Sequence, residues 1–557
     1  MNNHFYSRSV VLFFSTVPSA VYAQNVEPPL ELEQVVVTAT REAQKLSETP
    51  ASIGAVKTDA IQADKPTHPS QTMAQMPGVA VAVTNGEGHT TAIRQPFTTS
   101  PVYLFLEDGI PSRSTGFFNH NAMYELNLAQ AGGVEVTRGP GSALYGSDAI
   151  GGIVNVLTRM PPIGGEAYIS LEAGEFGWRR ALIGGGYGTA EHGARGDLNL
   201  TTTDGWRERT AYDRKSGSLR WDASVGDNAG LKTILGFSNI DQQTGANSPL
   251  IRSDFKNNPT LNYLPIAFRK VDALRLSTNY EHQFGNSLLS LTPYFRDNSM
   301  DLLASFRLRF DPTVSESENK SYGLMAKWRT NFSPLRAKLI GGIDIDVSPG
   351  SRKEFRLNVV TSGSAASRQF LSSTRGTQIY DYDVEFRGMS PYIHGEISPT
   401  TRLRITAGLR YDQLRYQLAN RNSGAVAVSA GTSSVFYGQA ADTTKTFQRA
   451  SPKLGATFAI TAQHHLYGSL NYGFRAPSEG DLFRPSNGSS AAAAQVSAQA
   501  ASELKPIKAR QLELGVRGQF GPMNYDAVLY DLQKRDDILS FTDRSLPGSP
   551  SRSTTDG

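Results

Sequence analysis

The side chains best suited to bind a ligand gather in two short stretches of the N-terminal third. One is Arg94-Gln95-Pro96-Phe97, and the other is residues 111–124, which combine arginine with aromatic and amide groups. Arginine forms charge-assisted hydrogen bonds to anions, and aromatic rings stack on other rings. These types suit an anionic, ring-bearing ligand. The candidate contacts are Arg94, Phe97, Arg113, Phe117, Phe118, Asn119 and His120.

The same residues also have a structural interpretation. Phe117 and Phe118 would then pack against a neighbouring wall, and His120 would only form local hydrogen bonds. The residue types leave both interpretations open at each position.

The chain lacks the residue sets on which most enzymes depend. It contains no Cys, which excludes thiol catalysis, thiolate metal sites and iron–sulfur clusters. Its nine His form no group with metal-ligand spacing, and no Ser, His and Asp stand at a recognisable catalytic spacing. We therefore expect neither an enzyme nor a bound cofactor. A net charge of +4 over 557 residues is also too weak to predict a nucleic-acid partner.

A glycine-rich stretch, residues 139–152, partly resembles a phosphate-binding loop. It lacks the Gly-Lys-Ser/Thr ending, and it leads into the β-branched run 153–158 rather than into a helix. We interpret its glycines as residues that allow tight turns and close packing.

The first residues have the pattern of an export signal. Arg8 precedes an apolar stretch, and Val21-Tyr22-Ala23 suits cleavage after Ala23. This predicts a signal peptide over residues 1–23. A membrane helix is the poorer interpretation because the stretch is short and contains Pro18. No later apolar run reaches the roughly 18 residues that a membrane helix needs, so a helical membrane protein is excluded.

From about Glu166 the chain becomes a series of alternating segments separated by turns. Leu274, Leu276 and Tyr280 share one face of such a segment, while polar residues occupy the other face. One such hairpin also fits a soluble β-sandwich. Because the pattern repeats along the chain, we predict a transmembrane β-barrel over residues 161–557.

Connections between these segments alternate in length, as in barrels with short periplasmic turns and long external loops. We expect a loop at the Ala/Ser/Gln-rich stretch 489–502, with a short helix as the alternative. The predicted long insertions are residues 242–267, 351–383, 419–444 and 478–505.

Residues 42–160 lack this rhythm. They mix short β-like runs with Gly and Pro and contain a possible helix at residues 69–76. This predicts a separate small α+β domain.

Ordered motifs in all three regions resemble those of TonB-dependent outer-membrane receptors of the siderophore receptor type. Residues 32–39 resemble a TonB box. Asp108-Gly109-Ile110-Pro111, residues 138–146 and residues 151–159 resemble plug motifs in their usual order. Ser451-Pro452-Lys453-Leu454-Gly455, Gly473-Phe474-Arg475-Ala476-Pro477-Ser478, Leu504-Lys505-Pro506 and Leu512-Glu513-Leu514-Gly515 resemble family strands.

The resemblance implies a mainly β fold, with an N-terminal α+β plug domain inside a large antiparallel transmembrane β-barrel. It also implies a multi-pass protein of the Gram-negative outer membrane that actively imports a scarce chelate, foremost a ferric siderophore. Cobalamin import, or a passive or adhesive barrel, is the alternative.

The outer membrane has no ATP, so the resemblance implies that energy comes from a TonB-like partner. That partner is expected to bind the periplasmic segment 24–41, because an exposed β-prone run readily adds a strand to a partner's sheet. A Val-Val-Val run is also ordinary in a strand. Arg138 and Glu513 are expected to couple plug to barrel, with Arg94 also facing the wall. The implied partner-binding residues are Glu33, Gln34, Val35, Val36, Val37, Thr38 and Ala39.

The two ends of the chain give further expectations. The sequence ends without the aromatic-terminated strand that closes such barrels, so C-terminal strands are expected to be missing. An unclosed barrel leaves unpaired backbone groups in lipid, which disfavours stable insertion. Residues 24–32 leave no room for a folded signalling domain, so we expect transport without transcriptional signalling.

Overall fold

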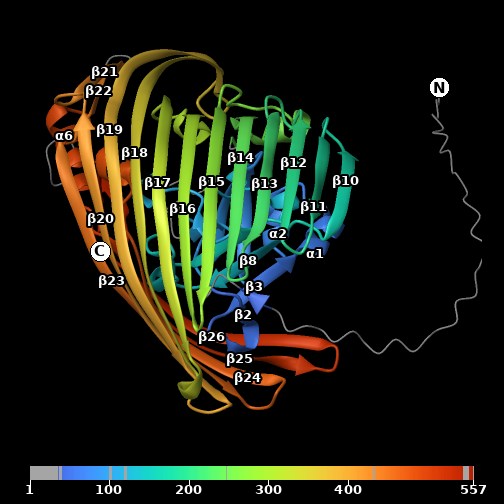
Figure 1. Ribbon diagram of the computed structural model, residues 1–557. Coiled ribbons are helices and arrows are strands. Elements are labelled where there is room, and N and C mark those ends of the chain that lie inside the picture. The colour runs from blue at the N-terminus through green and yellow to red at the C-terminus, as the bar shows by residue number, and fades with distance from the viewer. Residues whose placement is uncertain are drawn as a thin grey trace, which may run out of the picture.

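A 15-stranded antiparallel sheet forms a curved wall around a smaller domain built from the N-terminal third (Figure 1). The computed structural model describes residues 35–36, 41–98, 103–117, 122–245, 248–430, 433–542 and 551–555. Its architecture confirms the predicted mainly β class, with an α+β plug inside a large antiparallel barrel.

Each strand of the wall pairs with its neighbours along the chain, with one inserted hairpin, β21 (Val426–Ala430) with β22 (Ser433–Tyr437). The strands of the wall are β10 (Gly164–Ala173), β11 (Arg179–Gly188), β12 (His192–Thr203), β13 (Tyr212–Val225), β14 (Ala229–Gln243), β15 (Phe268–Phe284), β16 (Ser287–Leu303), β17 (Thr313–Phe332), β18 (Ala337–Ser362), β19 (Gln369–Ile397), β20 (Leu403–Asn420), β23 (Thr443–Ala459), β24 (His464–Arg475), β25 (Ile507–Phe520) and β26 (Met523–Arg535).

Side chains on the wall alternate between an outer apolar face and an inner polar face. On β15, Leu274 and Leu276 point outward and stay 39% and 42% exposed, whereas Arg275 between them is buried against the plug. The β15–β16 hairpin that the sequence predicted is confirmed, with Tyr280 opposite Leu291 and Gly285 in the turn at a φ of 55°. The outer face therefore suits lipid along the middle of the strands.

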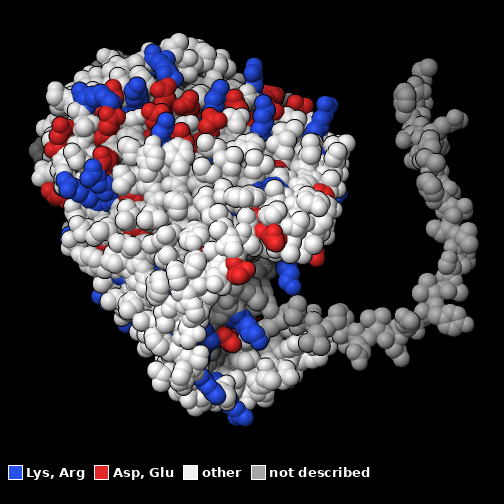
Figure 2. Space-filling model, in the orientation of Figure 1, with Lys and Arg blue, Asp and Glu red and all other residues white. Residues whose placement is uncertain are grey.

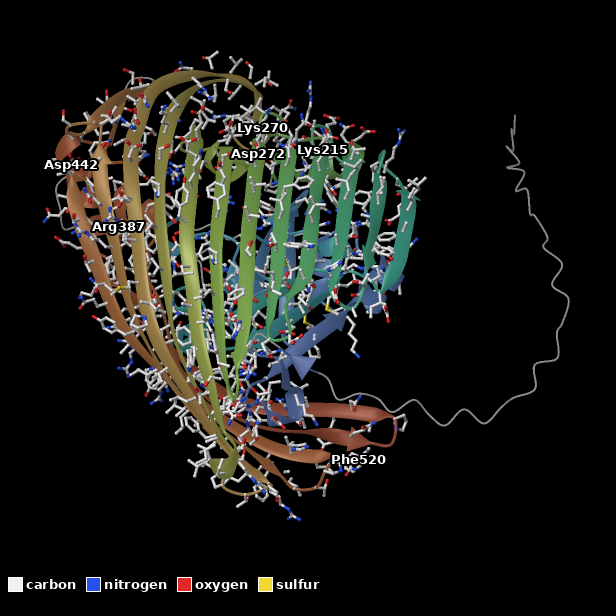
Figure 3. The ribbon with its side chains drawn as sticks, viewed as in Figure 1. Lys215, Lys270, Asp272, Arg387, Asp442 and Phe520 are labelled. Atoms are coloured by element: carbon white, nitrogen blue, oxygen red, sulfur yellow. The ribbon has the colours of Figure 1, made fainter. Side chains whose placement is uncertain are left out.

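Charged side chains mark where the outer apolar band ends. Figure 2 shows a belt of acidic and basic residues above a largely uncharged surface, and Figure 3 places Lys215, Lys270 and Asp272 at that level, with Phe520 at the opposite end. Exposed pairs in the belt include Lys270 with Asp241 at 3.2 Å. Tight turns with a left-handed Gly, such as Gly226 and Gly521, lie at the other end.

All four of the predicted long insertions contain regular structure. Strands β18 and β19 run through residues 351–383 and pair as far as Ser362 with Gln369, so the loop predicted there is wrong. Residues 489–502 include the helix α6 (Ala491–Ser502), the alternative that the sequence left open. Alanine favours a helix, and the Ser490 side chain caps it by accepting from the Ala493 N–H at 3.1 Å. Other helices among the external connections are α4 (Arg252–Asn257), η6 (Ser305–Arg307) and α5 (Glu479–Phe483); η7 (Ser333–Leu335) lies in a turn at the opposite end.

The plug is a five-stranded mixed sheet with short helices around it. Its strand order is β3-β8-β9-β6-β7, with β6 and β9 parallel, and β4 and β5 form a separate hairpin. The elements are β3 (Ile53–Lys57), α1 (Thr58–Asp64), α2 (Pro69–Met73), β4 (Val79–Asn85), β5 (Gly88–Ile93), β6 (Tyr103–Glu107), β7 (Ile110–Pro111), β8 (Gly133–Arg138), α3 (Ser142–Tyr145) and β9 (Gly152–Leu157), with the 3₁₀ turns η1 (Leu46–Glu48), η2 (Thr115–Phe117), η3 (Ala122–Glu125) and η4 (Leu128–Gln130).

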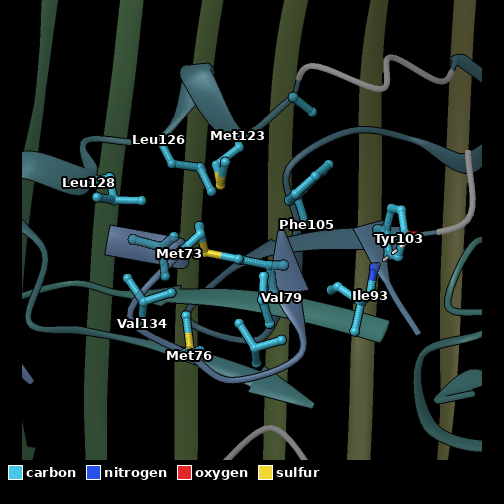
Figure 4. Packing of buried hydrophobic residues seen from close by; sticks show 14 of the residues in the cluster. Met73, Met76, Val79, Ile93, Tyr103, Phe105, Met123, Leu126, Leu128 and Val134 are labelled. Carbon is cyan, nitrogen blue, oxygen red and sulfur yellow. Dashed lines mark hydrogen bonds between the residues drawn. The ribbon is translucent and has the colours of Figure 1, made fainter. Parts of the chain in front are cut away.

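The predicted helix at residues 69–76 is present but shorter. α2 begins with Pro69, which suits the first helical turn, and His68 caps it in a box with Gln71. Met73 and Met76 then point into the plug core beside Val79, Phe105 and further apolar residues (Figure 4). The same buried cluster includes Ile507 and Ala509 of β25, so one patch of barrel wall completes the core.

The wall has two ends in the described part of the chain. β10 and β26 are the outermost strands of the sheet and are not paired with each other there, so the barrel is not closed. A separate hairpin, β27 (Leu539–Thr542) with β28 (Ser551–Thr554), packs against α6. Among the described residues, every helix is too short or too polar to cross a bilayer.

We expect Leu276→Arg to destabilise the folded protein by about 2–4 kcal/mol, because it places a charge on the outer face near the middle of β15. Urea unfolding in lipid vesicles measures this change. Gln417→Arg, outward on β20 opposite Glu385 in the charged belt, is the control and should cost less than about 1 kcal/mol. Equal losses in the two variants would contradict the assignment of the outer face.

The interface between plug and barrel

The segment expected to bind the energy-transducing partner is described only at two residues. Val35 and Val36 form β1 (Val35–Val36), whose backbone pairs antiparallel with Lys45 and Gln44 of β2 (Gln44–Lys45). β2 lies at the end of the barrel that has the tight turns (Figure 1). The remaining predicted residues, Glu33, Gln34, Val37, Thr38 and Ala39, lie outside the described part of the chain.

The residues just after this segment are tied to the barrel by charge. Arg41 donates from both terminal nitrogens to the two carboxylate oxygens of Asp344 on β18, at 2.9 and 2.7 Å. Its guanidinium also lies over the ring of Tyr145 in the plug at 4.6 Å and over that of Tyr392 on β19 at 4.9 Å. Asp344 also accepts from Arg410 of β20. Arg41 is therefore held by a carboxylate of β18 and lies over the rings of two tyrosines.

Glu42 makes the next attachment. Its two oxygens accept from Lys327 at 2.6 Å and from Arg329 at 2.8 Å, both on β17. Burial tends to raise the pKa of Glu42, but these two cations hold it below its ordinary value. The carboxylate is therefore ionised at neutral pH and stays paired.

A third attachment centres on Glu513 of β25. One carboxylate oxygen accepts from Arg94, and the other accepts the Ser52 N–H at 2.8 Å. Arg138 donates to the Ser52 hydroxyl at 2.8 Å. Burial and the nearby charge of Arg94 lower the pKa of Arg138 below its ordinary value. The structure thus brings Arg94, Arg138 and Glu513 together, with Arg94 as the direct ion-pair partner and Arg138 acting through Ser52.

The pattern continues around the plug. Glu87 pairs with Arg214 of β13 at 2.9 Å, and Glu107 pairs with Arg275 of β15 at 2.9 Å. Arg517 of β25 donates to the Ala51 carbonyl at 2.6 Å. Plug carboxylates and carbonyls therefore meet barrel arginines on several sides. Such pairs have large desolvation costs that offset their attraction, yet removing one partner is costly. They fix the position of the plug without strong net adhesion.

The loop after α3 binds the outer end of β24. The Ser147 hydroxyl accepts from the Ala476 N–H at 3.0 Å, and the Asp148 N–H donates to the Phe474 carbonyl at 3.2 Å. Burial raises the pKa of Asp148 to about 7, although Arg475 at 3.9 Å opposes the shift. This contact therefore contains a carboxyl group that titrates near neutral pH.

The residues predicted to contact ligand have different environments. Phe97 is exposed, Arg113 donates to Glu125 at 2.6 Å, and Phe117 is buried in an apolar cluster that includes Phe386 of β19. Arg94 lies at the wall with its guanidinium over the Tyr530 ring. Phe118, Asn119 and His120 lie outside the described residues.

Sequence reasoning missed an aromatic surface on the inner wall. Tyr380, Tyr382 and Phe386 alternate on the inner face of β19, beside Tyr416 of β20, and all are buried. The connection between β24 and β25 covers them: Tyr382 donates to Glu479 at 2.6 Å. The alternation of aromatic residues with Asp381, Asp383 and Glu385 was a detectable strand signal. The sequence analysis missed this strand because it interpreted residues 351–383 as a long external loop.

Among the described residues, no three His, Asp or Glu side chains are arranged to hold a metal ion. Buried charge pairs around a small domain suit a plug that is held in one position inside the barrel and can be released from it.

Comparison with known proteins gives the family. The model for the TonB dependent receptor-like β-barrel matches residues 217–555, and that for the TonB-dependent receptor plug domain matches residues 45–153. The chain is 25% identical to the vitamin B12 transporter BtuB of Vibrio vulnificus (strain CMCP6) over 528 residues, covering 93% of this chain and 72% of that protein. It is 24% identical to the rhizobactin receptor of Rhizobium meliloti (strain 1021) over 595 residues, covering 96% and 76%.

Solved structures agree on the fold. The pyoverdine outer membrane receptor FpvA from Pseudomonas aeruginosa PAO1, bound to pyoverdine, superposes with a TM-score of 0.72 at 16% identity, over 93% of this chain and 75% of that one. Because the barrel match alone spans more than half of the sequence, the chain belongs to the TonB-dependent receptor family.

Proposed function

We propose that this receptor imports a ferric siderophore across the Gram-negative outer membrane, with energy supplied by a TonB-like protein. The observation that carries the proposal is the set of buried charge pairs that join the plug to the barrel, beginning at Arg41, five residues after Val36. A plug held by polar contacts exchanges them for water on release, so modest work suffices to move it. A plain porin needs no such closure.

Residues 33–39 are the proposed attachment point for the partner. Strand addition to this β-prone segment supplies affinity through main-chain hydrogen bonds. A pull on the segment acts next on Arg41 and Glu42, because these follow directly and hold β18 and β17. The plug end nearest the partner therefore loosens first.

The outward site is proposed at the opposite end of the plug. It comprises Phe97, Arg113 and Phe117, and Phe117 packs in one buried cluster with inner aromatic residues of β19 and β20. The sequence adds Phe118, Asn119 and His120 as candidates. Arginine and aromatic rings suit an anionic, ring-bearing chelate. The chain is similar to the rhizobactin receptor and to the pyoverdine receptor FpvA bound to pyoverdine. These similarities support a siderophore as the cargo.

Cobalamin import is the second candidate, favoured by the similarity to a vitamin B12 transporter. Partner-dependent uptake of radiolabelled ferric siderophores and of cyanocobalamin by cells carrying the receptor separates the two. Uptake of cyanocobalamin alone would overturn the siderophore assignment, and partner-independent uptake of small solutes would support a passive barrel instead.

We expect Val36→Pro to abolish uptake and to leave cargo binding at the cell surface intact. Proline removes the backbone donor that strand addition needs, and the outward site is at the other end of the plug. Val36→Thr, which keeps the donor and a β-branched side chain, is the control and should transport normally. Normal uptake by the proline variant would remove residues 33–39 as the attachment point.

We expect Arg94 and Glu513 to show a coupling free energy of about 1–3 kcal/mol in a double-mutant cycle, because their charges are in direct contact and buried. The cycle uses Arg94→Ala and Glu513→Ala and the free energy of unfolding in urea. A parallel cycle of Arg138→Ala with Glu513→Ala should give a smaller coupling, since Ser52 stands between them. Strict additivity for both pairs would exclude Glu513 as the residue that couples plug to barrel.

A further inference from the structure

A buried carboxyl group lies where the plug meets the outer end of β24. It belongs to Asp148, whose backbone adopts a φ of 75° in the turn after α3. The Asp148 N–H donates to the Phe474 carbonyl at 3.2 Å, and the hydroxyl of Ser147 accepts from the Ala476 N–H at 3.0 Å. These backbone contacts fix Asp148 in place, and its carboxyl group is held away from water.

One arginine serves this carboxyl group and a second one. Arg475 is buried and donates to Asp481 of α5, while its Nε lies 3.9 Å from a carboxylate oxygen of Asp148. If both carboxyl groups were ionised, their two negative charges would share a single buried cation. Such a pair favours one bound proton. The arrangement is therefore a binding site for a proton.

Asp148 is the member of the pair that takes the proton. The side chain of Asp481 is 27% exposed and that of Asp148 is 4% exposed. Asp481 also accepts the N–H and the hydroxyl of Ser478 at 2.9 and 2.8 Å, and these contacts favour its ionised form. Burial raises the pKa of Asp148 to about 7, because Arg475 offsets only part of the cost of removing the charge from water.

The other charged groups around Asp148 are already engaged. On α5, Glu479 pairs with Arg352 at 3.4 Å, and on β20, Arg410 donates to Asp412 at 2.8 Å. Among the described residues, Arg475 is therefore the one cation that pairs with Asp148. The titratable or charged groups that face Asp148 are Arg475 of β24, Glu479 and Asp481 of α5, and Arg410, Asp412 and Tyr416 of β20.

The same contact links the plug to an external connection. Ala476, which donates to Ser147, comes two residues before Ser478, the residue that caps α5. Phe117 of η2 packs in one buried cluster with Leu482 and Phe483 of α5. A change that separates Asp148 from the end of β24 therefore also loosens α5 from the turn that carries Phe117.

We propose that the turn 146–149 and the start of the β24–β25 connection form a proton-controlled joint, which is closed while Asp148 is neutral and opens when Asp148 is ionised. Opening hydrates the carboxylate and frees α5 to move away from η2. The proton is exchanged with solvent, and no other reactant takes part. The joint is a property of the resting receptor and does not depend on which cargo is imported.

The direction of the pH effect follows from the two states of the joint. In the open joint Asp148 has about its ordinary pKa of 3.8, whereas in the closed joint its pKa is about 7. Closure therefore binds a proton between these two values, and the ratio of closed to open joints falls about tenfold for each unit of rising pH. The closed joint has its full stability below about pH 4, and the ratio stops falling above about pH 7.

Hydrogen exchange of the full chain in lipid vesicles measures this ratio, because the N–H groups of Asp148 and Ala476 belong to the joint. Protection is taken relative to an unstructured peptide at the same pH. We expect it to fall about tenfold per unit between about pH 5 and pH 7 and to level off above that. The amides of β8 in the plug core should keep their protection. An equal fall in β8, or no fall at the joint, overturns the proposal.

Asp148→Asn removes the proton-binding group and keeps the turn, since Asn readily adopts a positive φ. Protection at the joint should then stay constant over the same pH range. Asp442→Asn, at an exposed carboxyl near the external end of the wall (Figure 3), is the matched control and should retain the full fall. An undiminished fall in Asp148→Asn would show that another group binds the proton and would refute the assignment.

Asp481→Asn tests the shared arginine. The new amide still accepts the Ser478 N–H, but it no longer competes for the charge of Arg475. The pKa of Asp148 should fall, so the pH at which protection levels off should shift downward. An unchanged levelling-off pH in this variant would show that the two carboxyl groups do not share Arg475, and the proposed joint would then be wrong.

Discussion

The hydrogen-bonding demand of the backbone in lipid governs the rest of this structure. Every N–H and C=O within the apolar layer needs a protein partner, which an antiparallel wall supplies from strand to strand. The pleat then sends alternate side chains outward, where Leu274 and Leu276 meet lipid, and inward, where Arg275 cannot face lipid and reaches the plug instead. Because the inward side chains of the wall are polar, the lumen of the barrel is polar. The surface of the plug that meets the lumen is therefore polar as well.

This ordering explains why so many contacts between plug and wall are charged. The plug core is apolar and is completed by Ile507 and Ala509 of β25, and Phe117 and Tyr124 also pack against apolar residues of the wall. Elsewhere the contacts are pairs such as Glu87 with Arg214, which lose little net free energy when both partners become hydrated together. The interface thus fixes the resting position of the plug, while the free energy needed to separate the plug from the wall stays low.

The sequence predicts the parts of the fold that depend on local alternation. The β15–β16 hairpin, the plug's helix at Pro69 and the outer apolar face all follow from residue spacing. Residues 351–383 were misread because the outer face there lies beyond lipid and is polar, so apolar alternation ends while strand pairing continues. Glu513 forms its ion pair with Arg94, whereas Arg138 donates to Ser52. Which arginine reaches the carboxylate depends on the folded geometry, and residue spacing in the sequence does not predict it.

The short β1–β2 ladder has a consequence for the partner. Val35 and Val36 already use their backbone groups with Lys45 and Gln44, so an incoming strand competes with an internal one. The apparent dissociation constant then equals the intrinsic one divided by the fraction of receptors whose ladder is open. With only two residue pairs to separate, that fraction responds to small changes in free energy. Any event that strains residues 41–45 therefore sets how many receptors in the membrane are available to the energy source.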